Sequence, residues 1–106
     1  MRIKEINKWI DEGGSLPQDL TQEEEEHLTK LGWSVKGALH HNGQKWWVQH
    51  YLHGKDHGKW EGWRGNGQKW YEWNYLHGMQ HGVFKSWDKD GSLFIDHEYF
   101  YGNKIK

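Results

Sequence analysis

One feature of this 106-residue chain restricts its fold more than any other: a 24-residue segment occurs twice in succession and then a third time in part. Residues 42–65 read NGQKWWVQHYLHGKDHGKWEGWRG, residues 66–89 read NGQKWYEWNYLHGMQHGVFKSWDK, and twelve of the 24 positions are identical without a gap. Residues 90–106 begin a third, degenerate copy. A period of this length is typical of repeat proteins, in which each unit stacks on the next.

Two sets of turn signals divide each period into strands. An Asn-Gly or Asp-Gly pair opens every copy, which is the strongest short-range signal for a β-hairpin. A His-Gly pair follows at Gly54 and Gly78. The stretches of about six to eight residues between these turns are rich in Trp, Tyr, Phe and Val, which predicts strands. We therefore expect a mainly β fold, a single-layer antiparallel meander of hairpin repeats that opens with a strand over residues 33–40.

Alternation along these strands defines two faces. The face that holds most of the repeated aromatic residues is expected to be the packed one, with large rings lying over glycines of neighbouring strands. The opposite face begins with an aromatic residue in each copy and, apart from that residue, becomes polar from copy to copy. The members of the first face are Trp47, Gln49, Tyr51, Tyr71, Trp73, Tyr75, Ile95, His97 and Tyr99.

The first 32 residues have a different pattern. An isoleucine stripe at helical spacing precedes Gly13-Gly14, which ends the helix. Thr21 and Glu24 have the spacing of a capping box, which predicts the start of a second helix. We predict short helices over residues 2–12 and 22–31. The two parts of the chain are then a helical cap (residues 1–32) and a repeat domain (residues 33–106, with units 42–65, 66–89 and the partial 90–106).

Composition excludes several classes of protein. The chain has no cysteine, so it has no disulfide and no thiolate metal site, which fits a reducing compartment. No apolar run approaches the roughly 20 residues that span a bilayer, and the N-terminus lacks the apolar core of a signal peptide. A net charge of −1 provides no strong field for DNA or anionic lipid. We expect a cytoplasmic protein that has no cofactor and does not bind membranes.

The repeated pattern G-Q-K-W-x-x-x-x-Y-L-H-G-x-x-H-G, followed by an aromatic-rich strand and a new Asn-Gly or Asp-Gly, resembles the MORN repeat over residues 33–104. It is most similar to the variant found in bacterial proteins, some of them antitoxin-like. The third copy departs from the pattern, because Gly102 is kept but no His-Gly follows it. The structural repeat residues on which the resemblance rests are Gly43, Tyr51, Gly54, His57, Gly58, Gly67, Tyr75, Gly78, His81 and Gly82.

The resemblance implies an elongated antiparallel sheet that binds other proteins and has no catalytic residues. The chain itself gives the same expectation, since its acidic and His side chains scatter along an open sheet that offers no concave site for catalysis. His53 and His57 flank a glycine turn, where a spacing of four does not place both rings on one face for a metal ion. We expect structural histidines, no metal site and no enzymatic activity.

These observations predict a non-enzymatic module that binds another protein through its aromatic-rich sheet, as an inhibitor or antitoxin-like protein. Trp, Tyr and Arg dominate the hot spots of interfaces. The open edge of the partial third repeat is expected to allow two copies to associate. The residues expected to contact the partner, the first four of them from the less packed face, are Trp46, Trp60, Arg64, Trp70 and Tyr101.

An alternative prediction uses the same rings as a platform for a small ligand. Aromatic side chains interleaved with Lys or Arg stack on nucleotides, on sugars or on single-stranded nucleic acid. Lys45, Lys69 and Arg64 lie beside the tryptophans in sequence. The mildly basic repeat domain gives only a weak electrostatic attraction for nucleic acid.

Overall fold

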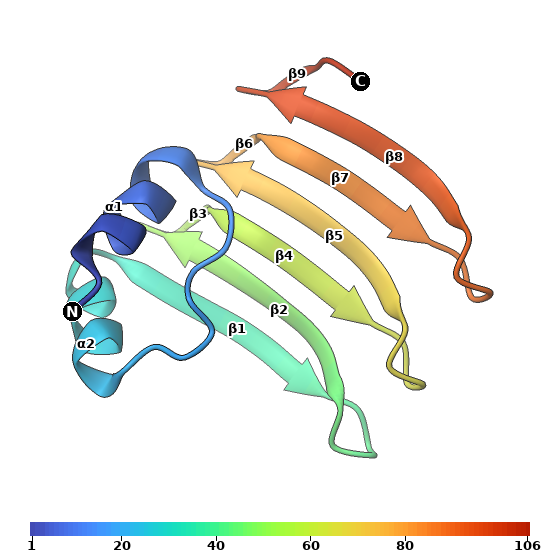
Figure 1. Cartoon of the computed structure of the whole chain (residues 1–106), viewed down its shortest axis with the longest axis horizontal. Helices are drawn as coiled ribbons and strands as arrows, with labels where there is room; N and C mark the ends of the chain where they lie inside the picture. The colour runs from blue at the N-terminus through green and yellow to red at the C-terminus, as the bar shows by residue number, and fades with distance from the viewer.

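Nine strands form one open antiparallel sheet, which follows two helices along the chain in the computed structural model of residues 1–106. The helices are α1 (Ile3–Glu12) and α2 (Gln22–Lys30). The strands are β1 (Trp33–Leu39), β2 (Lys45–Leu52), β3 (Lys55–Asp56), β4 (Gly58–Trp63), β5 (Lys69–Leu76), β6 (Met79–Gln80), β7 (Gly82–Trp87), β8 (Leu93–Phe100) and β9 (Asn103–Lys104). The long strands lie side by side in chain order, from β1 at one edge to β8 near the other (Figure 1).

The sequence repeat is also a structural repeat. The long strands β2, β5 and β8 each begin 24 residues after the one before, and each pairs at its end with the short strand that follows it. The prediction of a mainly β fold, with an open antiparallel sheet behind two short helices, is therefore confirmed.

The turns that end the long strands have a left-handed backbone. Leu52 pairs with Lys55 across a two-residue loop, in which φ is 52° at His53 and 75° at Gly54. Positive φ at both loop residues is the pattern of a type I′ turn, whose twist matches that of antiparallel strands. The same pair of positive φ values recurs at His77-Gly78 and at Tyr101-Gly102.

A β-bulge recurs near the start of β2, β5 and β8. Two adjacent residues of β4 pair with Lys69 and with Tyr71, so Trp70 is an extra residue without a partner in the ladder. The bulge interrupts the alternation of side chains. Lys69 binds Glu72 on one face, while Tyr71 lies on the other. The strict alternation assumed from the sequence therefore fails at the bulged residues, which are Trp46, Trp70 and Phe94.

Both helices match their predicted ranges to within one residue. The predicted capping box is present, because the Glu24 N–H donates to Thr21 Oγ1 at 3.1 Å and the Thr21 N–H donates to Glu24 Oε1 at 3.0 Å. The Arg2 guanidinium donates to both oxygens of the same carboxylate, and this bonding holds the pKa of Glu24 far below its usual range. Arg2 thereby ties the start of α1 to the start of α2. Neither helix qualifies as a candidate membrane span.

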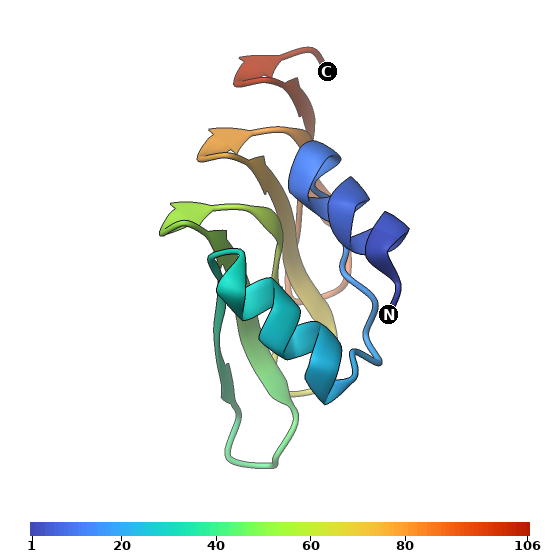
Figure 2. The same cartoon turned by 90° about the vertical axis from the view of Figure 1, so that its left-hand side faces the viewer.

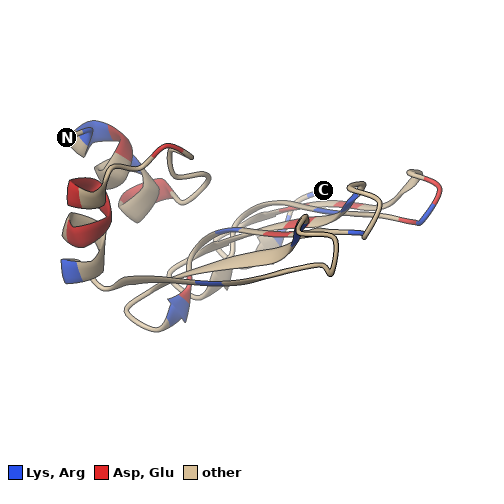
Figure 3. Ribbon diagram, turned by 90° about the horizontal axis from the view of Figure 1, so that it is seen from below, with Lys and Arg blue, Asp and Glu red and all other residues tan.

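The helices cover one face of the sheet at one end only (Figures 2 and 3). Leu52 and Leu76 end β2 and β5 and are 4% and 1% exposed, whereas Phe100 at the equivalent position of β8 is 55% exposed. The helical cap therefore buries the ends of the first two repeats and leaves the third open. The buried residues that form this core are Ile6, Trp9, Leu16, Leu28 and Leu52.

This placement corrects one expectation from the sequence. The core lies on the face of His50, Leu52 and Leu76, which was expected to be the less packed one. The physical reason is that leucines end the strands on that face, so the isoleucine stripe of α1 buries apolar surface there. The rings of the opposite face pack against one another, and no second layer covers them (Figure 3).

His57 joins the cap to the repeats. Its side chain is fully buried, Nε2–H donates to the Trp9 carbonyl at 2.8 Å, and Nδ1 accepts a hydrogen bond from the His77 N–H at 3.0 Å. The neighbouring Gly58 lies so close to the Trp9 indole that a Cβ atom there would overlap the ring. The end of α1, the turn after β3 and the turn after β5 are thus held together at one point.

Candidate functional site

The uncovered face of the sheet carries a continuous array of rings, here called the aromatic face. One row of rings crosses five strands, with successive centroids 5.6, 4.9, 5.3 and 4.9 Å apart. Edge-on and tilted pairs at such distances are favourable. Across β2, β4, β5, β7 and β8, in that order, the row consists of Tyr51, Trp60, Tyr75, Phe84 and Tyr99.

A second set of rings lies beside this row. Tyr71 stacks on Trp73 at 4.5 Å, and Trp73 lies nearly parallel to Phe84 at 6.2 Å. Trp47 and Tyr71 both pair with Gly62 of β4, from either side. The Tyr71 ring occupies the space that a Cβ at Gly62 would need. The expectation that large rings lie over glycines of neighbouring strands is confirmed at this position.

The aromatic face is apolar at its centre. Burial raises the pKa of the Tyr71 and Tyr75 hydroxyl groups, so both are neutral at physiological pH. At the margin, Lys36 of the edge strand β1 lies 5.5 Å from the centre of the Tyr51 ring, which is a cation–π contact. Phe84 is buried among its neighbours, whereas the other rings remain partly accessible. An apolar centre with accessible rings and a polar margin has the composition of a protein interface.

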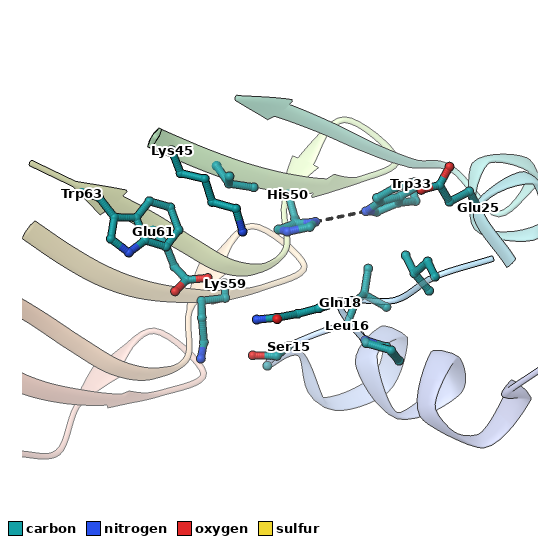
Figure 4. Close-up of a pocket in the computed structure, with 14 residues that line it drawn as sticks. Ser15, Leu16, Gln18, Glu25, Trp33, Lys45, His50, Lys59, Glu61 and Trp63 are labelled. Carbon is teal, nitrogen blue, oxygen red and sulfur yellow. Dashed lines mark hydrogen bonds between the residues drawn. The ribbon is translucent and has the colours of Figure 1, made fainter. Parts of the chain in front are cut away.

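A polar groove opens on the opposite face of the sheet, at the margin of the cap. It lies between the segment that links α1 to α2 and the strands β2 and β4, and its volume is about 230 Å³ (Figure 4). Leu16, Val48 and Trp63 provide apolar wall. The polar side chains that line the groove are Ser15, Gln18, Glu25, Lys45, His50, Lys59 and Glu61.

The Glu61 carboxylate of this groove and the Glu72 carboxylate on the neighbouring strand are both bound to one lysine. Lys69 Nζ forms an ion pair with Glu61 and donates to Glu72 Oε1 at 3.0 Å. Burial lowers the pKa of Lys69, but its bonds to Glu61 and Glu72 outweigh that effect and raise the pKa overall. Lys59 Nζ reaches Glu72 only at 3.8 Å.

Lys45 and His50 are donors of the groove that have no acceptor. Lys45 forms no ion pair, and its Nζ lies 5.6 Å from the centre of the Trp63 ring. His50 Nδ1 accepts a hydrogen bond from the Trp33 indole N–H at 3.2 Å, so the proton of the neutral ring lies on Nε2. Burial lowers the pKa of His50, which keeps the ring neutral at physiological pH.

The five residues expected to bind a partner do not lie on one surface. Trp60 was assigned to the less packed face, but β4 pairs it with Trp73, and its ring contacts Tyr51 and Tyr75 in the aromatic face. This assignment was wrong because the register of β4 sets its faces: Gly62 pairs with Trp47, and Trp60, two residues earlier, lies on the same face.

The other four expected residues lie at the two ends of the strands. Arg64 and Trp70 meet at the end far from the cap, where the guanidinium carbon is 5.0 Å from the centre of the ring. Trp46 lies at the same end against His40, with centroids 5.4 Å apart. Tyr101 lies in the turn at the opposite end. The structure therefore brings together Arg64 and Trp70 but not the whole set.

Sequence reasoning missed the array because it treated its members as packing residues. Phe84 was not singled out at all, although it lies 24 residues after Trp60 and therefore shares its place in the repeat. Tyr51 and Tyr75 were assigned a structural role, yet their rings form part of an accessible surface. The period of 24, applied to each aromatic residue in turn, is the signal that places them in one row.

Comparisons with protein-family models, with curated proteins and with solved structures found no match to this chain. The geometry of the aromatic face and of the groove is therefore the basis for a proposal about function.

The buried histidines lead to an expected loss of stability in mild acid. Burial lowers the pKa of both His50 and His57 in the folded chain, whereas an unfolded His titrates near about 6.5. Below that pH the unfolded state therefore binds more protons than the folded state does. The free energy of unfolding has its full value above about pH 7 and falls as the pH drops through about 6.5. Urea denaturation at a series of pH values measures this slope. A free energy of unfolding that stays constant or rises on acidification to about pH 5.5 would show that these rings are not buried.

Proposed function

We propose that this chain is a non-enzymatic repeat module that binds another protein through its aromatic face. One observation supports this most strongly: rings from five strands form a continuous apolar surface over which no other part of the chain lies. Large uncovered apolar patches are uncommon on soluble proteins and usually mark sites of interaction. Trp and Tyr are also the residue types that contribute most to binding energy at interfaces.

The rigidity of the face favours binding. Each ring is held by its neighbours and, at Tyr71, by direct contact with the backbone of Gly62. Side chains with few rotatable bonds lose little conformational entropy when a partner covers them. A surface that is already ordered in the free protein therefore retains more of its contact energy as affinity.

We also propose that the repeats are related to MORN repeats and that the module acts as an inhibitor or antitoxin-like protein. In both complete copies, a G-x-x-H-G segment forms a tight turn and a two-residue strand, and its His accepts a hydrogen bond from the next turn. An inhibitor needs only to occupy a surface of its partner. This agrees with the ion pairs beside the groove, where Glu61 and Glu72 are bound to Lys69 rather than free for acid–base catalysis.

Site-specific photo-crosslinking tests the proposed surface. p-Benzoylphenylalanine at Trp47 lies on the aromatic face, and the same residue at Lys85, which pairs with Glu72, lies on the opposite face beyond the cap. In cells that naturally express the chain, the probe at 47 is expected to form a discrete adduct with a second protein, and the probe at 85 is not. Crosslinking only from position 85, or from neither position in folded protein, would refute the proposed surface.

The captured partner then allows a quantitative measurement. Trp47→Ala is expected to weaken binding about thirtyfold or more, because hot-spot tryptophans contribute at least about 2 kcal/mol. Lys85→Ala on the opposite face serves as the matched control and is expected to leave the affinity unchanged. Isothermal titration calorimetry with both purified proteins gives the two dissociation constants. Equal affinities for the two variants would place the interface elsewhere.

A further inference from the structure

The groove beside the cap has the features of a separate binding site, on the face of the sheet opposite to the aromatic face. Its volume of about 230 Å³ lies below the roughly 300–1,000 Å³ of sites for drug-sized ligands, so a small molecule fits it. Five structural parts build it: the connector after α1, the helix α2 and the strands β1, β2 and β4 (Figure 4). The groove therefore exists only when the cap is docked on the sheet.

The charges in the groove leave cations available. Glu61 and Glu72 share the single ammonium group of Lys69, so neither balances a second lysine closely. Lys59 lies 3.8 Å from Glu72, at the limit of an ion pair, and Lys45 has no ion-pair partner. The other carboxylate of the lining belongs to Glu25, which is exposed and lies beside Trp33, across the groove from Lys45 (Figure 4). Lys45 and Lys59, whose pairing is incomplete, therefore form a separate positive part of the groove that attracts an anion.

His50 adds a neutral donor to these cations. Because Nδ1 already accepts the Trp33 indole N–H, the ring presents Nε2–H as its remaining polar group. No acceptor in the chain takes this proton within hydrogen-bonding distance. Figure 4 shows the Lys45 ammonium, the His50 ring and the Gln18 amide pointing toward the same space.

Apolar surface lies next to this set of donors. Leu16 and Val48 line the groove, and the Trp63 ring forms its outer wall beneath Lys45. A ligand with one charged end and one flat apolar end matches such a site, because the first needs donors and the second needs an aromatic wall.

We propose that this groove binds a small organic oxyanion, with its carboxylate or phosphate group held by Lys45, Lys59 and His50 Nε2–H and its apolar body against Trp63 and Leu16. The proposal does not depend on the aromatic face, since the two surfaces lie on opposite sides of the sheet. The same donors can bind either a carboxylate or a phosphate group, and a titration distinguishes the two.

The test is an NMR titration of the full chain with benzoate, with phenyl phosphate and with neutral benzyl alcohol, at constant ionic strength. Saturable shifts are expected for one or both anions, confined to amides around the groove such as those of Gln18, Val48 and His50. Benzyl alcohol is expected to bind much more weakly. An effect of benzoate alone identifies a carboxylate site, and an effect of phenyl phosphate alone identifies a phosphate site. Shifts spread over both faces of the sheet, or none with either anion, would overturn the proposal.

Lys45→Gln and Lys36→Gln form a matched pair of variants. Each lysine lies over a ring: Lys45 Nζ is 5.6 Å from the Trp63 ring centre, and Lys36 Nζ is 5.5 Å from the Tyr51 ring centre. Lys45 lines the groove, whereas Lys36 lies on the aromatic face. Lys45→Gln is expected to lower the affinity for the anion about tenfold, because a charge-assisted hydrogen bond is lost. Lys36→Gln is expected to leave the affinity unchanged. If Lys45→Gln does not fold, Lys59→Gln tests the same prediction. An equal affinity in folded variants and wild type would refute the site.

Discussion

Replacing Gly58 with alanine is expected to lower the free energy of unfolding by about 3 kcal/mol or more. Gly58 has a φ of 84°, a left-handed conformation that costs an L-residue about 1–2 kcal/mol. A Cβ atom would also overlap the Trp9 indole and lie 3.2 Å from the Gly14 carbonyl oxygen. Because Trp9 is buried in the core of the cap, α1 would have to move away from the sheet.

Gly43→Ala is the matched control for this variant. Gly43 also has a φ of 84°, but nothing lies within 4 Å of a Cβ placed there. The free energy of unfolding of this variant is therefore expected to fall only by the backbone cost of about 1–2 kcal/mol. Urea denaturation of the two variants separates the contact from the backbone conformation. Equal losses in the two variants would contradict the close packing of Trp9 on the repeat sheet.

The second large effect is expected at His57, where alanine should lower the free energy of unfolding by about 3 kcal/mol. The substitution removes a fully buried ring and its hydrogen bonds to the Trp9 carbonyl and the His77 N–H. It leaves a cavity between α1 and the sheet, and the His77 N–H loses its partner. Each of these changes is destabilising on its own.

His81→Ala tests whether the effect comes from burial or from the repeat position. His81 occupies the same place one repeat later and accepts a hydrogen bond from the Tyr101 N–H at 2.9 Å, but it is only partly buried. The free energy of unfolding of the His81→Ala variant is expected to fall by about 1 kcal/mol, the usual net value of one hydrogen bond. A loss at His81 as large as that at His57 would mean that the cap contributes little at this site.

Local rules predicted much of this structure. Thr21 and Glu24 form the capping box that their spacing indicates, and the His-Gly pairs form the turns expected of them. The open antiparallel sheet expected from the repeats is also present. Such features depend on a few neighbouring residues, so the sequence contains all of the information that they need.

Features that depend on contacts between distant segments were less accessible. The bulge at Trp70 changes the face of neighbouring side chains, and nothing in the local sequence marks it. The position of the cap depends on Leu52 and Leu76 being buried by helices that lie far away in the chain. The groove joins Lys45 and His50 to Gln18 of the connector, a proximity that only the docked cap creates.

Hydroxyl-radical footprinting of the free protein, read by mass spectrometry, tests most directly whether the aromatic face is uncovered. Trp9 is 1% exposed and serves as the internal reference for a buried indole. The expected result is that Trp47 and Trp73, which are partly accessible, are oxidised much faster than Trp9 at every protein concentration. Protection of Trp47 and Trp73 to the level of Trp9 would show that a second layer or a second copy covers this face, and would contradict a sheet that presents its rings to a partner.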